Sequence, residues 1–396
     1  MTAPRLGPEP ALPAKAEHVI LGAGVVGLGT AYQLAKRGVE DIVVVDRGYV
    51  LSGASGRNGG GVRAQWTTRE NIELARRSIA LFRGLSAELG LNIWLRQGGY
   101  LLLSFSEESA RGLRQAVAFQ NQHGVPTRLL TEAEALEIVP ELNTRGLVQA
   151  SYGPGDGILF PWPVVWGYYQ KCRELGVTVV HHTAVTGLDV AGNGTKRIAR
   201  VRTSKGNVEV RGQVVNATGA WSKGVAAMAG VDLPNVPVKH EILCTEALKP
   251  FLKPMVVDLR NGLYLSQDMR GEVITGIGDP ATKPGLDQGS SFEFLQGIAR
   301  ALVGLMPTLR HVKVVRQWAG LYDMTPDHVP ILGATPGFAN FVQANGFSGH
   351  GFMVSPMVAV LLAQLLAGQR TALDLAPFDL GRFARGEVHH ESFVIG

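Results

Sequence analysis

Residues 18–27 read HVILGAGVVG, and this stretch decides the fold. An apolar run ends at Leu21, a glycine pattern follows, and a helical pattern comes next. Gly22 permits a tight turn, Gly24 lets a pyrophosphate approach the backbone, and Gly27 lets the helix pack against the strand. A pyrophosphate held there would meet free N–H groups at a helix N-terminus, where the helix dipole favours negative charge.

A second apolar run, Ile42–Val45, ends on Asp46. The distance from Gly22 matches the place where a carboxylate binds a ribose hydroxyl in dinucleotide-binding units. The helical pattern between the two runs covers Val25–Arg37, and Gly38 stops it. The order of strand, turn, helix, strand and acid therefore predicts a βαβ unit that holds a dinucleotide.

Length and composition set the scale of the molecule. A chain of 396 residues with 45% hydrophobic content exceeds the size at which one core usually stops growing, so we expect two packed domains. The 38 Lys and Arg against 33 Asp and Glu give a net charge of only +5, and the basic residues are scattered. A nucleic-acid binder would usually concentrate them in a stripe, so we expect no nucleic-acid partner.

Cysteines and histidines do not indicate a metal site. Cys172 and Cys244 lie far apart without zinc-ligand spacing, so neither a disulfide framework nor a zinc site is expected, and a reducing, cytoplasmic compartment fits. The adjacent pair His181-His182 sits near a strand end, where neighbouring side chains point to opposite faces. The pair His389-His390 lies in the C-terminal tail, and no third ligand follows at a usable spacing.

Neither end of the chain reads as a membrane segment. Residues 1–16 form a predicted flexible tail, because they are rich in Pro and Ala and lack the apolar core of a signal peptide. The longest apolar stretch, Phe352–Ala367, is interrupted by Ser355 and Pro356 and is shorter than the roughly 20 residues that span a bilayer. It is predicted to be a buried core helix.

The remaining patterns predict a second domain inserted into the first. Helices are expected over 68–89, 106–123, 163–176 and 291–305 and from a capping box at 131. Strands are expected over 96–105 and 177–180, with a β-meander over 184–210 and a buried-strand run over 213–221 that ends in small residues. The resulting fold class is α/β with α+β: a discontinuous Rossmann-type domain and a mainly antiparallel-sheet substrate domain. The first comprises residues 17–90, 150–225 and 318–396, and the second comprises 91–149 and 226–317.

Five segments in order resemble the flavoprotein amine oxidase family that includes sarcosine oxidase, glycine oxidase and D-amino acid oxidase. They are the fingerprint with Asp46, then Ser52–Gly60, Asn216–Trp221, Trp318–Asp327 and Gly346–Phe352. The likeness covers nearly the whole chain and is greatest to sarcosine oxidases and to the beta-type subunits of heteromeric sarcosine oxidases and proline dehydrogenases. It implies that the dinucleotide is FAD.

The resemblance implies which residues surround that FAD. The loop Gly346–Gly351 leads into a helix beginning near Phe352, so its amides can point at the flavin pyrimidine edge, where negative charge develops on reduction. The expected cofactor-binding residues are Gly22, Gly24, Val25, Val26, Gly27, Asp46, Arg47, Ser55, Gly56, Arg57, Asn58, Gly59, Gly60, Val185, Ala217, Thr218, Gly219, Trp221, Gly320, Gly346, Phe347, Ser348, Gly349, His350, Gly351, Phe352 and Met353.

The chemistry implied by the family is hydride transfer from a C–H next to an amine nitrogen to flavin N5, which gives an imine that water hydrolyses. The reduced flavin would be reoxidised by O2 to give H2O2. An amino-acid substrate needs a cation for its carboxylate, and a bidentate guanidinium suits that geometry. Arg63 lies where sarcosine oxidases carry such an arginine. His350, Met353 and Tyr264 complete the expected catalytic set, and His240 is a second candidate for lining the pocket.

Four departures from the family pattern sharpen this reading. Gly320 replaces the cysteine that attaches flavin covalently, and Pro161 lies near where beta-type subunits carry a histidine that tethers FMN, so a non-covalent FAD is expected. Met353 replaces a lysine that contacts the substrate carboxylate, and the adaptable methionine would admit a larger or cyclic amine. The strand 272–276 lacks a lysine that promotes reaction with O2, and His350 could supply some of that charge if protonated.

Three alternatives stay open on the sequence alone. The chain could be the FAD-bearing subunit of a heteromeric dehydrogenase that passes electrons to a partner. It could be a nicotinamide-dependent dehydrogenase that uses Asp46 and Arg47 around the adenosine ribose. The sequence pI near 9.2 suggests a flavin-bearing RNA-modifying protein, for which retention of RNA that collapses with salt would be required.

Overall fold

The structure is a computed structural model of the chain, and it describes residues 8–388 and 390–393. The predictions for residues 1–7 and for His389 lie outside the described residues. Lys15–Ala16 form strand β1, which pairs in parallel with β12, Gly206–Val210. This end of the predicted flexible tail therefore belongs to a sheet.

A six-stranded sheet forms the centre of the nucleotide-binding half. Its strand order is β19-β20-β13-β2-β3-β9, and all neighbours are parallel except β19 and β20. The bounds are β2 His18–Leu21, β3 Ile42–Val45, β9 Thr178–Val180, β13 Val214–Asn216, β19 Ile331–Ala334 and β20 Phe341–Asn345. Strands β2 and β3 are buried at every position, which explains their unbroken apolar sequences. The predicted Rossmann-type sheet is confirmed.

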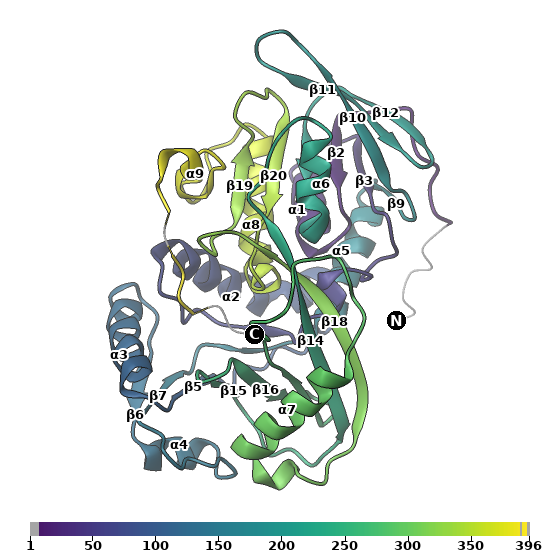
Figure 1. Ribbon diagram of the computed structural model, residues 1–396. Helices are drawn as coiled ribbons and strands as arrows, with labels where there is room; N and C mark the ends of the chain where they lie inside the picture. Colours follow the sequence, from purple (N-terminus) through teal and green to yellow (C-terminus); the bar gives the residue numbers. More distant parts are fainter. Residues whose placement is uncertain (1–7, 389, 394–396) are drawn as a thin grey trace.

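Three helices cover one face of this sheet, and a fourth, α2, packs on them (Figure 1). They are α1 Val25–Ala35, α2 Arg69–Leu89, α5 Pro161–Glu174 and α8 Gly351–Leu366. Helix α1 packs against α5 and α8, and α2 packs against α8. The apolar stretch that begins at Phe352 is thus a buried core helix, as predicted. Within the described part of the chain, no helix combines the length and apolar content needed to cross a membrane.

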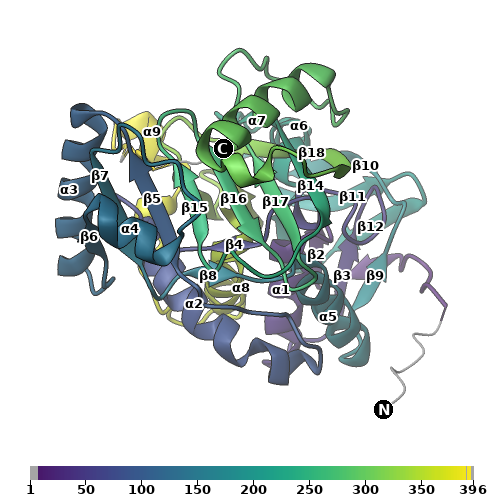
Figure 2. The same cartoon turned by 90° about the horizontal axis from the view of Figure 1, so that it is seen from below.

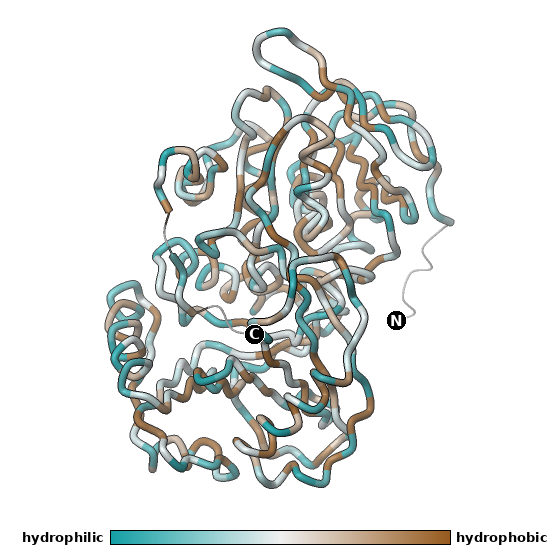
Figure 3. The backbone as a smooth tube through the Cα atoms, viewed as in Figure 1, coloured by the Kyte–Doolittle hydropathy of each residue, from teal (hydrophilic) through white to brown (hydrophobic). Residues whose placement is uncertain are grey.

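A small mixed sheet, antiparallel except for the β1–β12 pair, covers the opposite face. Its order is β1-β12-β11-β10, with β10 at Val185–Ala191 and β11 at Arg197–Thr203. One apolar cluster joins this meander to the parallel sheet, with members such as Ile198 and Val201 on one side and Val19 on the other. Figure 3 shows hydrophobic segments running along the strands of this half. Both faces of the parallel sheet are therefore buried.

The other half of the molecule is built on an eight-stranded sheet of order β18-β14-β17-β16-β15-β5-β7-β6. The strands are β5 Tyr100–Ser104, β6 Arg128–Leu130, β7 Gln149–Gly153, β14 Val236–Ala247, β15 Met255–Asp258, β16 Leu263–Gln267, β17 Glu272–Gly276 and β18 Val314–Met324. Helices α3 Glu107–Gln122, α4 Glu132–Ile138 and α7 Phe292–Leu305 lie over it (Figure 2). Apart from the parallel β5 and β15, neighbouring strands are antiparallel.

The expected elements agree with the structure except at some ends. The capping box at Thr131 and Glu134 is present, and the strand expected over 96–105 is shorter, because Arg96 makes only an isolated bridge to Ile158. Strands β7 and β18 belong to the eight-stranded sheet although they cross the boundaries proposed at 150 and 318. The exact division into domains stays a prediction.

Candidate active site

The glycine fingerprint has the geometry that its sequence predicts. Gly22 adopts a φ of +104°, and a Cβ atom there would lie 2.4 Å from the carbonyl oxygen of Ala217. A Cβ on Gly27 would lie 1.9 Å from the carbonyl oxygen of Gly22. The first glycine therefore makes the tight turn and the third lets α1 approach β2. Gly24 is the N-cap of α1 and has no side-chain cap, so the helix N-terminus stays open.

Asp46 ties the second strand of the unit to the fingerprint. One of its carboxylate oxygens accepts a hydrogen bond from the Ala23 N–H and the other accepts one from the Gly48 N–H, both at 2.7 Å. These bonds fix the carboxylate beside the turn, at the mouth of a cavity. Its contact with a ribose hydroxyl stays a prediction.

A cavity of about 850 Å³ extends from the fingerprint to the eight-stranded sheet. Every residue predicted for cofactor binding or catalysis lines it, with three exceptions: Gly27, Gly56 and Gly346. These three shape the backbone instead. A Cβ on Gly56 would lie 2.2 Å from the Leu51 carbonyl oxygen, and one on Gly346 would lie 2.4 Å from Cγ2 of Thr325.

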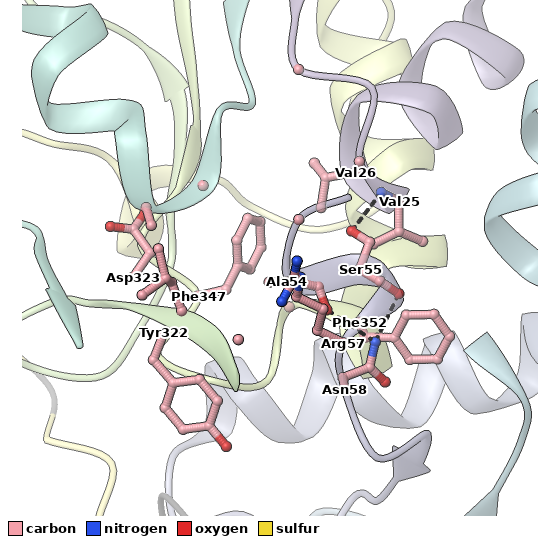
Figure 4. Close-up of a pocket in the computed structure, with 18 of the residues that line it drawn as sticks. Val25, Val26, Ala54, Ser55, Arg57, Asn58, Tyr322, Asp323, Phe347 and Phe352 are labelled. Atoms are coloured by element: carbon pink, nitrogen blue, oxygen red, sulfur yellow. Dashed lines mark hydrogen bonds between the residues drawn. The ribbon is translucent and has the colours of Figure 1, made fainter. Parts of the chain in front are cut away.

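The glycine-rich loop before β4, Gly61–Val62, forms one wall of the cavity and includes the 3₁₀ turn η1, Ala54–Gly56. Ser55 Oγ accepts a hydrogen bond from the Val25 N–H at 3.0 Å, so the loop is tied to the start of α1 (Figure 4). The Arg57 guanidinium donates to the carbonyl oxygens of Ser52 and Ala319 at 2.9 Å each. Arg57 thus connects the fingerprint side with β18.

At another edge of the cavity, Arg47 lies over an aromatic ring. The centre of its guanidinium is 4.7 Å from the centroid of the Trp221 ring. Trp221 ends the 3₁₀ turn η2, Gly219–Trp221, which follows the carboxyl end of β13 and precedes α6, Ser222–Ala227. Both side chains line the cavity next to Asp46, which places them where the predicted adenosine half would bind.

The loop before α8 is held in an unusual conformation. Ser348, which is not a glycine, has a φ of +46°, and its N–H donates to the carbonyl oxygen of Asp323 at 2.9 Å. Its hydroxyl oxygen accepts a hydrogen bond from the Thr325 N–H at 3.1 Å and lies 3.2 Å from the Thr325 hydroxyl, with which it shares a second hydrogen bond. Helix α8 then begins with His350 as an N-cap that makes no side-chain cap. The open N–H groups of the first turn therefore border the cavity.

Arg63 lies at the substrate end and is 2% exposed. Its guanidinium donates to the carbonyl oxygens of Gln65 and Phe393 and lies 3.6 Å from the centroid of the Trp66 ring. Burial lowers the pKa of Arg63, but an arginine stays charged in proteins. Among the described residues, its side-chain hydrogen bonds go to neutral carbonyls, which leaves its charge available to a carboxylate.

The histidines of the cavity are neutral. Burial lowers the pKa of His240 to about 4 and the pKa of His350 to about 3. His240 Nε2 lies 3.0 Å from the Tyr264 hydroxyl, and its ring stacks on Tyr322 with centroids 4.7 Å apart. Burial of the ring therefore disfavours the protonated His350 that would supply positive charge beside the cofactor, and that role stays a prediction.

Several cavity residues were missing from the predicted site. Tyr100, Trp66 and Tyr322 form aromatic walls near Arg63, and Asp323 lies beneath the loop before α8. Tyr100 is the first residue of β5, whereas Tyr322 is near the end of β18, so their proximity arises from the order of the sheet. Tyr322 and Asp323 do fall within the family-like segment before Thr325, which is the one signal that could have found them.

The cavity fits an FAD on its own features. Gly24 and Gly320 line it without side chains, so the backbone can approach a ligand closely. Oδ1 of Asp323 and both ring nitrogens of His350 are buried without a hydrogen-bond partner among the described residues. Such groups call for a polar ligand. Within the described residues, no group of three His, Cys, Asp or Glu side chains could hold a metal ion.

Fold and cavity together define a dinucleotide-binding protein in which the cavity extends from the parallel sheet to a second, eight-stranded sheet. A family model described as DAO, FAD dependent oxidoreductase, matches residues 17–365, and the chain belongs to this family. The protein is therefore an FAD-dependent oxidoreductase, which removes the nicotinamide alternative. The FAD is bound non-covalently, and at the family's cysteine position Gly320 offers no side chain for a bond.

Known relatives match over nearly their full length. The chain is 31% identical over 384 residues to a sarcosine oxidase subunit beta of Rhodobacter capsulatus, covering 96% of this chain and 91% of that one. It is 30% identical to the glycine oxidase of Geobacillus kaustophilus, covering 92% and 96%. The crystal structure of L-proline dehydrogenase from P. horikoshii superimposes with a TM-score of 0.89 at 36% identity, covering 96% and 100%.

Proposed function

We propose that the protein oxidises a secondary or N-methylated amino acid, sarcosine-like or proline-like, at the C–H bond next to nitrogen. The observation that carries this proposal is Arg63, a buried guanidinium bound to neutral carbonyls at the end of the cofactor cavity. A carboxylate there would gain a charge-assisted, bidentate pair in a desolvated site. The names of the relatives, which act on sarcosine, glycine and L-proline, support the same substrate class.

The residues of this chain would bind, orient and desolvate the reactants. The open N-termini of α1 and α8 and the Arg47 and Trp221 pair would hold the cofactor, and FAD supplies the acceptor for the hydride. Arg63 would orient the amino acid through its carboxylate. Positioning of this kind reduces the entropic part of the barrier.

The walls near Arg63 favour a compact amine with apolar surface. Tyr100, Met255 and Ile242 belong to one apolar cluster and line the cavity, which Met353 lines as well. The neighbouring His240 is neutral, so it does not repel a cationic amine. Methionine adapts to irregular shapes, which suits a cyclic as well as an N-methylated substrate.

Anaerobic bleaching of the bound flavin tests the substrate class. The panel is sarcosine, L-proline, N,N-dimethylglycine, glycine and D-amino acids, and we expect bleaching by at least one of the secondary or tertiary amines. Arg63→Ala should raise the apparent substrate constant by about a hundredfold or more, because it removes a charge-assisted pair worth about 3 kcal/mol. Arg63→Lys keeps the charge but loses the bidentate guanidinium, so its apparent substrate constant should lie between those of wild type and Arg63→Ala. Unchanged bleaching in Arg63→Ala would disprove the carboxylate assignment.

The electron acceptor proposed here is O2, with H2O2 as product. Rapid-mixing measurements on the reduced protein in air test this, because an oxidase loses its reduced flavin within seconds. Decay over minutes would exclude O2 as the working acceptor.

A second candidate function is that of a subunit in a heteromeric dehydrogenase. Relatives from Rhodobacter capsulatus and Arthrobacter are named as subunit beta, which implies a partner chain in those proteins. Phe160, Trp162 and Trp166 at the start of α5 are 37%, 46% and 41% exposed. Large exposed aromatic residues close together are typical of a protein interface. A cation beside the reduced flavin promotes reaction with O2, and His350 in its neutral form does not provide one, which favours this second candidate.

A further inference from the structure

Glu391 is a buried carboxylate near the end of the chain that the mechanism above does not use. It is 2% exposed, and its two oxygens accept hydrogen bonds from the backbone N–H groups of Thr67 and Thr68 at 3.0 Å. The hydroxyl groups of the same threonines donate at 2.5 and 2.9 Å. Thr68 is the N-cap of α2, so Glu391 satisfies open N–H groups at the positive end of a long helix.

These contacts hold the carboxylate in its charged form. Burial alone would raise the pKa of Glu391, but the hydrogen bonds from Thr67 and Phe393, together with Arg63, keep it below its usual range. Figure 1 shows the chain after α9, Arg382–Arg385, returning toward α2. The end of the chain is therefore attached to the element that directly follows Arg63 in sequence.

The attachment continues from Glu391 to Arg63. The Phe393 N–H donates to Oε1 of Glu391 at 2.9 Å, and the Phe393 carbonyl oxygen accepts a hydrogen bond from the Arg63 guanidinium. The second acceptor of that guanidinium is the carbonyl of Gln65. The orientation of Arg63 thus depends on a backbone group that Glu391 fixes.

The Phe393 side chain is anchored behind the wall of the cavity. It packs against an apolar cluster that includes Tyr100, Met255 and Tyr264. These three residues line the cavity. The packing of Phe393 therefore helps to hold its carbonyl group beside Arg63.

Hydrogen bonds to Asp327 and His328, and a buried ion pair next to them, also hold Glu391 in place. Its N–H donates to the carbonyl oxygen of Asp327 at 3.1 Å, and its own carbonyl oxygen lies 3.1 Å from Nδ1 of His328. Asp327 forms a bidentate ion pair with Arg382 at 2.8 and 3.0 Å, and both side chains are almost fully buried. The segment 391–393 is therefore held on both sides.

We propose that Glu391 is a positioning residue for substrate binding. Its carboxylate holds residues 391–393 so that the Phe393 carbonyl orients Arg63 toward the substrate carboxylate. This inference rests on the proposed function, because it requires Arg63 to bind a carboxylate.

The test compares Glu391→Ala, Glu391→Gln and Glu391→Asp with a matched control, Glu387→Gln, which changes an exposed glutamate paired with Arg385. The readouts are the dissociation constant of tetrahydro-2-furoate, followed by the change in flavin absorbance, and the constants for flavin reduction by L-proline and by pyrrolidine. Pyrrolidine keeps the ring and the amine but lacks the carboxylate.

We expect Glu391→Ala to weaken tetrahydro-2-furoate binding and to raise the apparent constant for L-proline by roughly ten- to a hundredfold, since a small misplacement of a binding group has effects of this size. The rate at saturation, the constant for pyrrolidine and the FAD content should stay close to wild type. Glu391→Asp should recover part of the loss, and Glu387→Gln should match wild type. If Glu391→Ala does not fold, Glu391→Gln carries the test, because it keeps the shape and loses the charge.

Two outcomes separate the two proposals. If wild type binds tetrahydro-2-furoate and Arg63→Ala abolishes binding, but folded Glu391 variants bind as wild type does, the positioning role is wrong and the proposed function stands. If wild type binds no carboxylate analogue and no amino acid bleaches its flavin, the proposed function fails and the role of Glu391 fails with it. Equal losses for L-proline and pyrrolidine would also overturn the positioning role, because they would indicate general damage.

Discussion

Burial sets the charge of the individual side chains around the cavity. His240 and His350 are neutral because desolvation lowers their pKa values to about 4 and about 3. Burial acts in the opposite direction on a carboxyl group and raises the pKa of Asp323 to about 6. Arg63 stays charged because guanidinium does not release its proton in this range. A carboxylate substrate therefore meets a fixed positive charge among neutral rings.

The first prediction concerns the contribution of His240 to stability against pH. Its folded pKa of about 4 lies below its ordinary value of 6.5, so the unfolded chain binds more protons as pH falls through this window. His240 therefore destabilises the protein as pH drops from 6.5 to 4, by up to about 1.4 kcal/mol per pH unit. His240→Gln should remove this slope.

The measurement is the unfolding free energy of wild type and His240→Gln in urea at pH 7.0 and 4.5, with FAD in excess. We expect the difference between the two proteins to shift in favour of the variant by about 2 to 3 kcal/mol at the lower pH. Burial raises the pKa values of Asp156 and Asp323 to about 6, so these two groups stabilise the folded protein as pH falls. Their contribution is the same in both proteins and cancels in the difference. The control is His311→Gln, which changes an exposed histidine. If the difference in unfolding free energy between wild type and His240→Gln is the same at both pH values, the prediction is contradicted.

At the scale of elements, the turn from β2 to α1 depends on close backbone contacts. Gly27 lies inside α1, and a Cβ there would overlap the carbonyl oxygen of Gly22 at 1.9 Å. Gly84 also lies inside a helix, α2, but a Cβ there meets nothing within 4 Å. The two positions share a helical backbone and differ in packing.

This difference predicts opposite effects of the same substitution. Gly84→Ala should stabilise the protein by about 1 kcal/mol, because alanine loses less conformational freedom in a helix. Gly27→Ala should destabilise it by more than about 3 kcal/mol and lower the FAD content, because the clashing atom is backbone and cannot turn away. Thermal unfolding midpoints and the ratio of flavin to protein absorbance measure both effects. A stable, FAD-replete Gly27→Ala protein would show that the contact is not required.

The elements also show why sequence predicted some of the site and missed the rest. The fingerprint was predictable because its parts lie close together in the sequence and together indicate a dinucleotide-binding unit. These parts are a glycine pattern, two apolar runs and Asp46. The conformation of Ser348 was not, since its positive φ depends on bonds to Asp323 and Thr325 across the fold. The neutral state of His350 depends on burial between elements distant in sequence, and no local pattern encodes it.

At the scale of the whole molecule, the cavity lies where the parallel sheet and the eight-stranded sheet meet. Strands β14 and β18 run alongside each other between the two halves (Figure 1). The fingerprint lines the cavity, and Phe393, far away in the sequence, accepts a hydrogen bond from Arg63, which also lines it. The start of α5 lies outside this closed region, yet it is joined to it, because the Trp162 indole N–H donates to the carbonyl of Gly56 at 3.1 Å.

The last prediction concerns this exposed surface, defined by Phe160, Trp162 and Trp166. If it is an interface, the chain prepared alone should self-associate with rising concentration, because water-exposed aromatic rings gain free energy when they are buried. The double variant Trp162→Ser, Trp166→Ser should sediment as a 42.3 kDa monomer over the same concentrations while it keeps its FAD and its anaerobic bleaching. Phe292→Ser removes an even more exposed aromatic residue on α7 and should leave association unchanged. A wild-type chain that stays monomeric throughout would remove the structural support for the subunit alternative and leave O2 as the acceptor to be tested first.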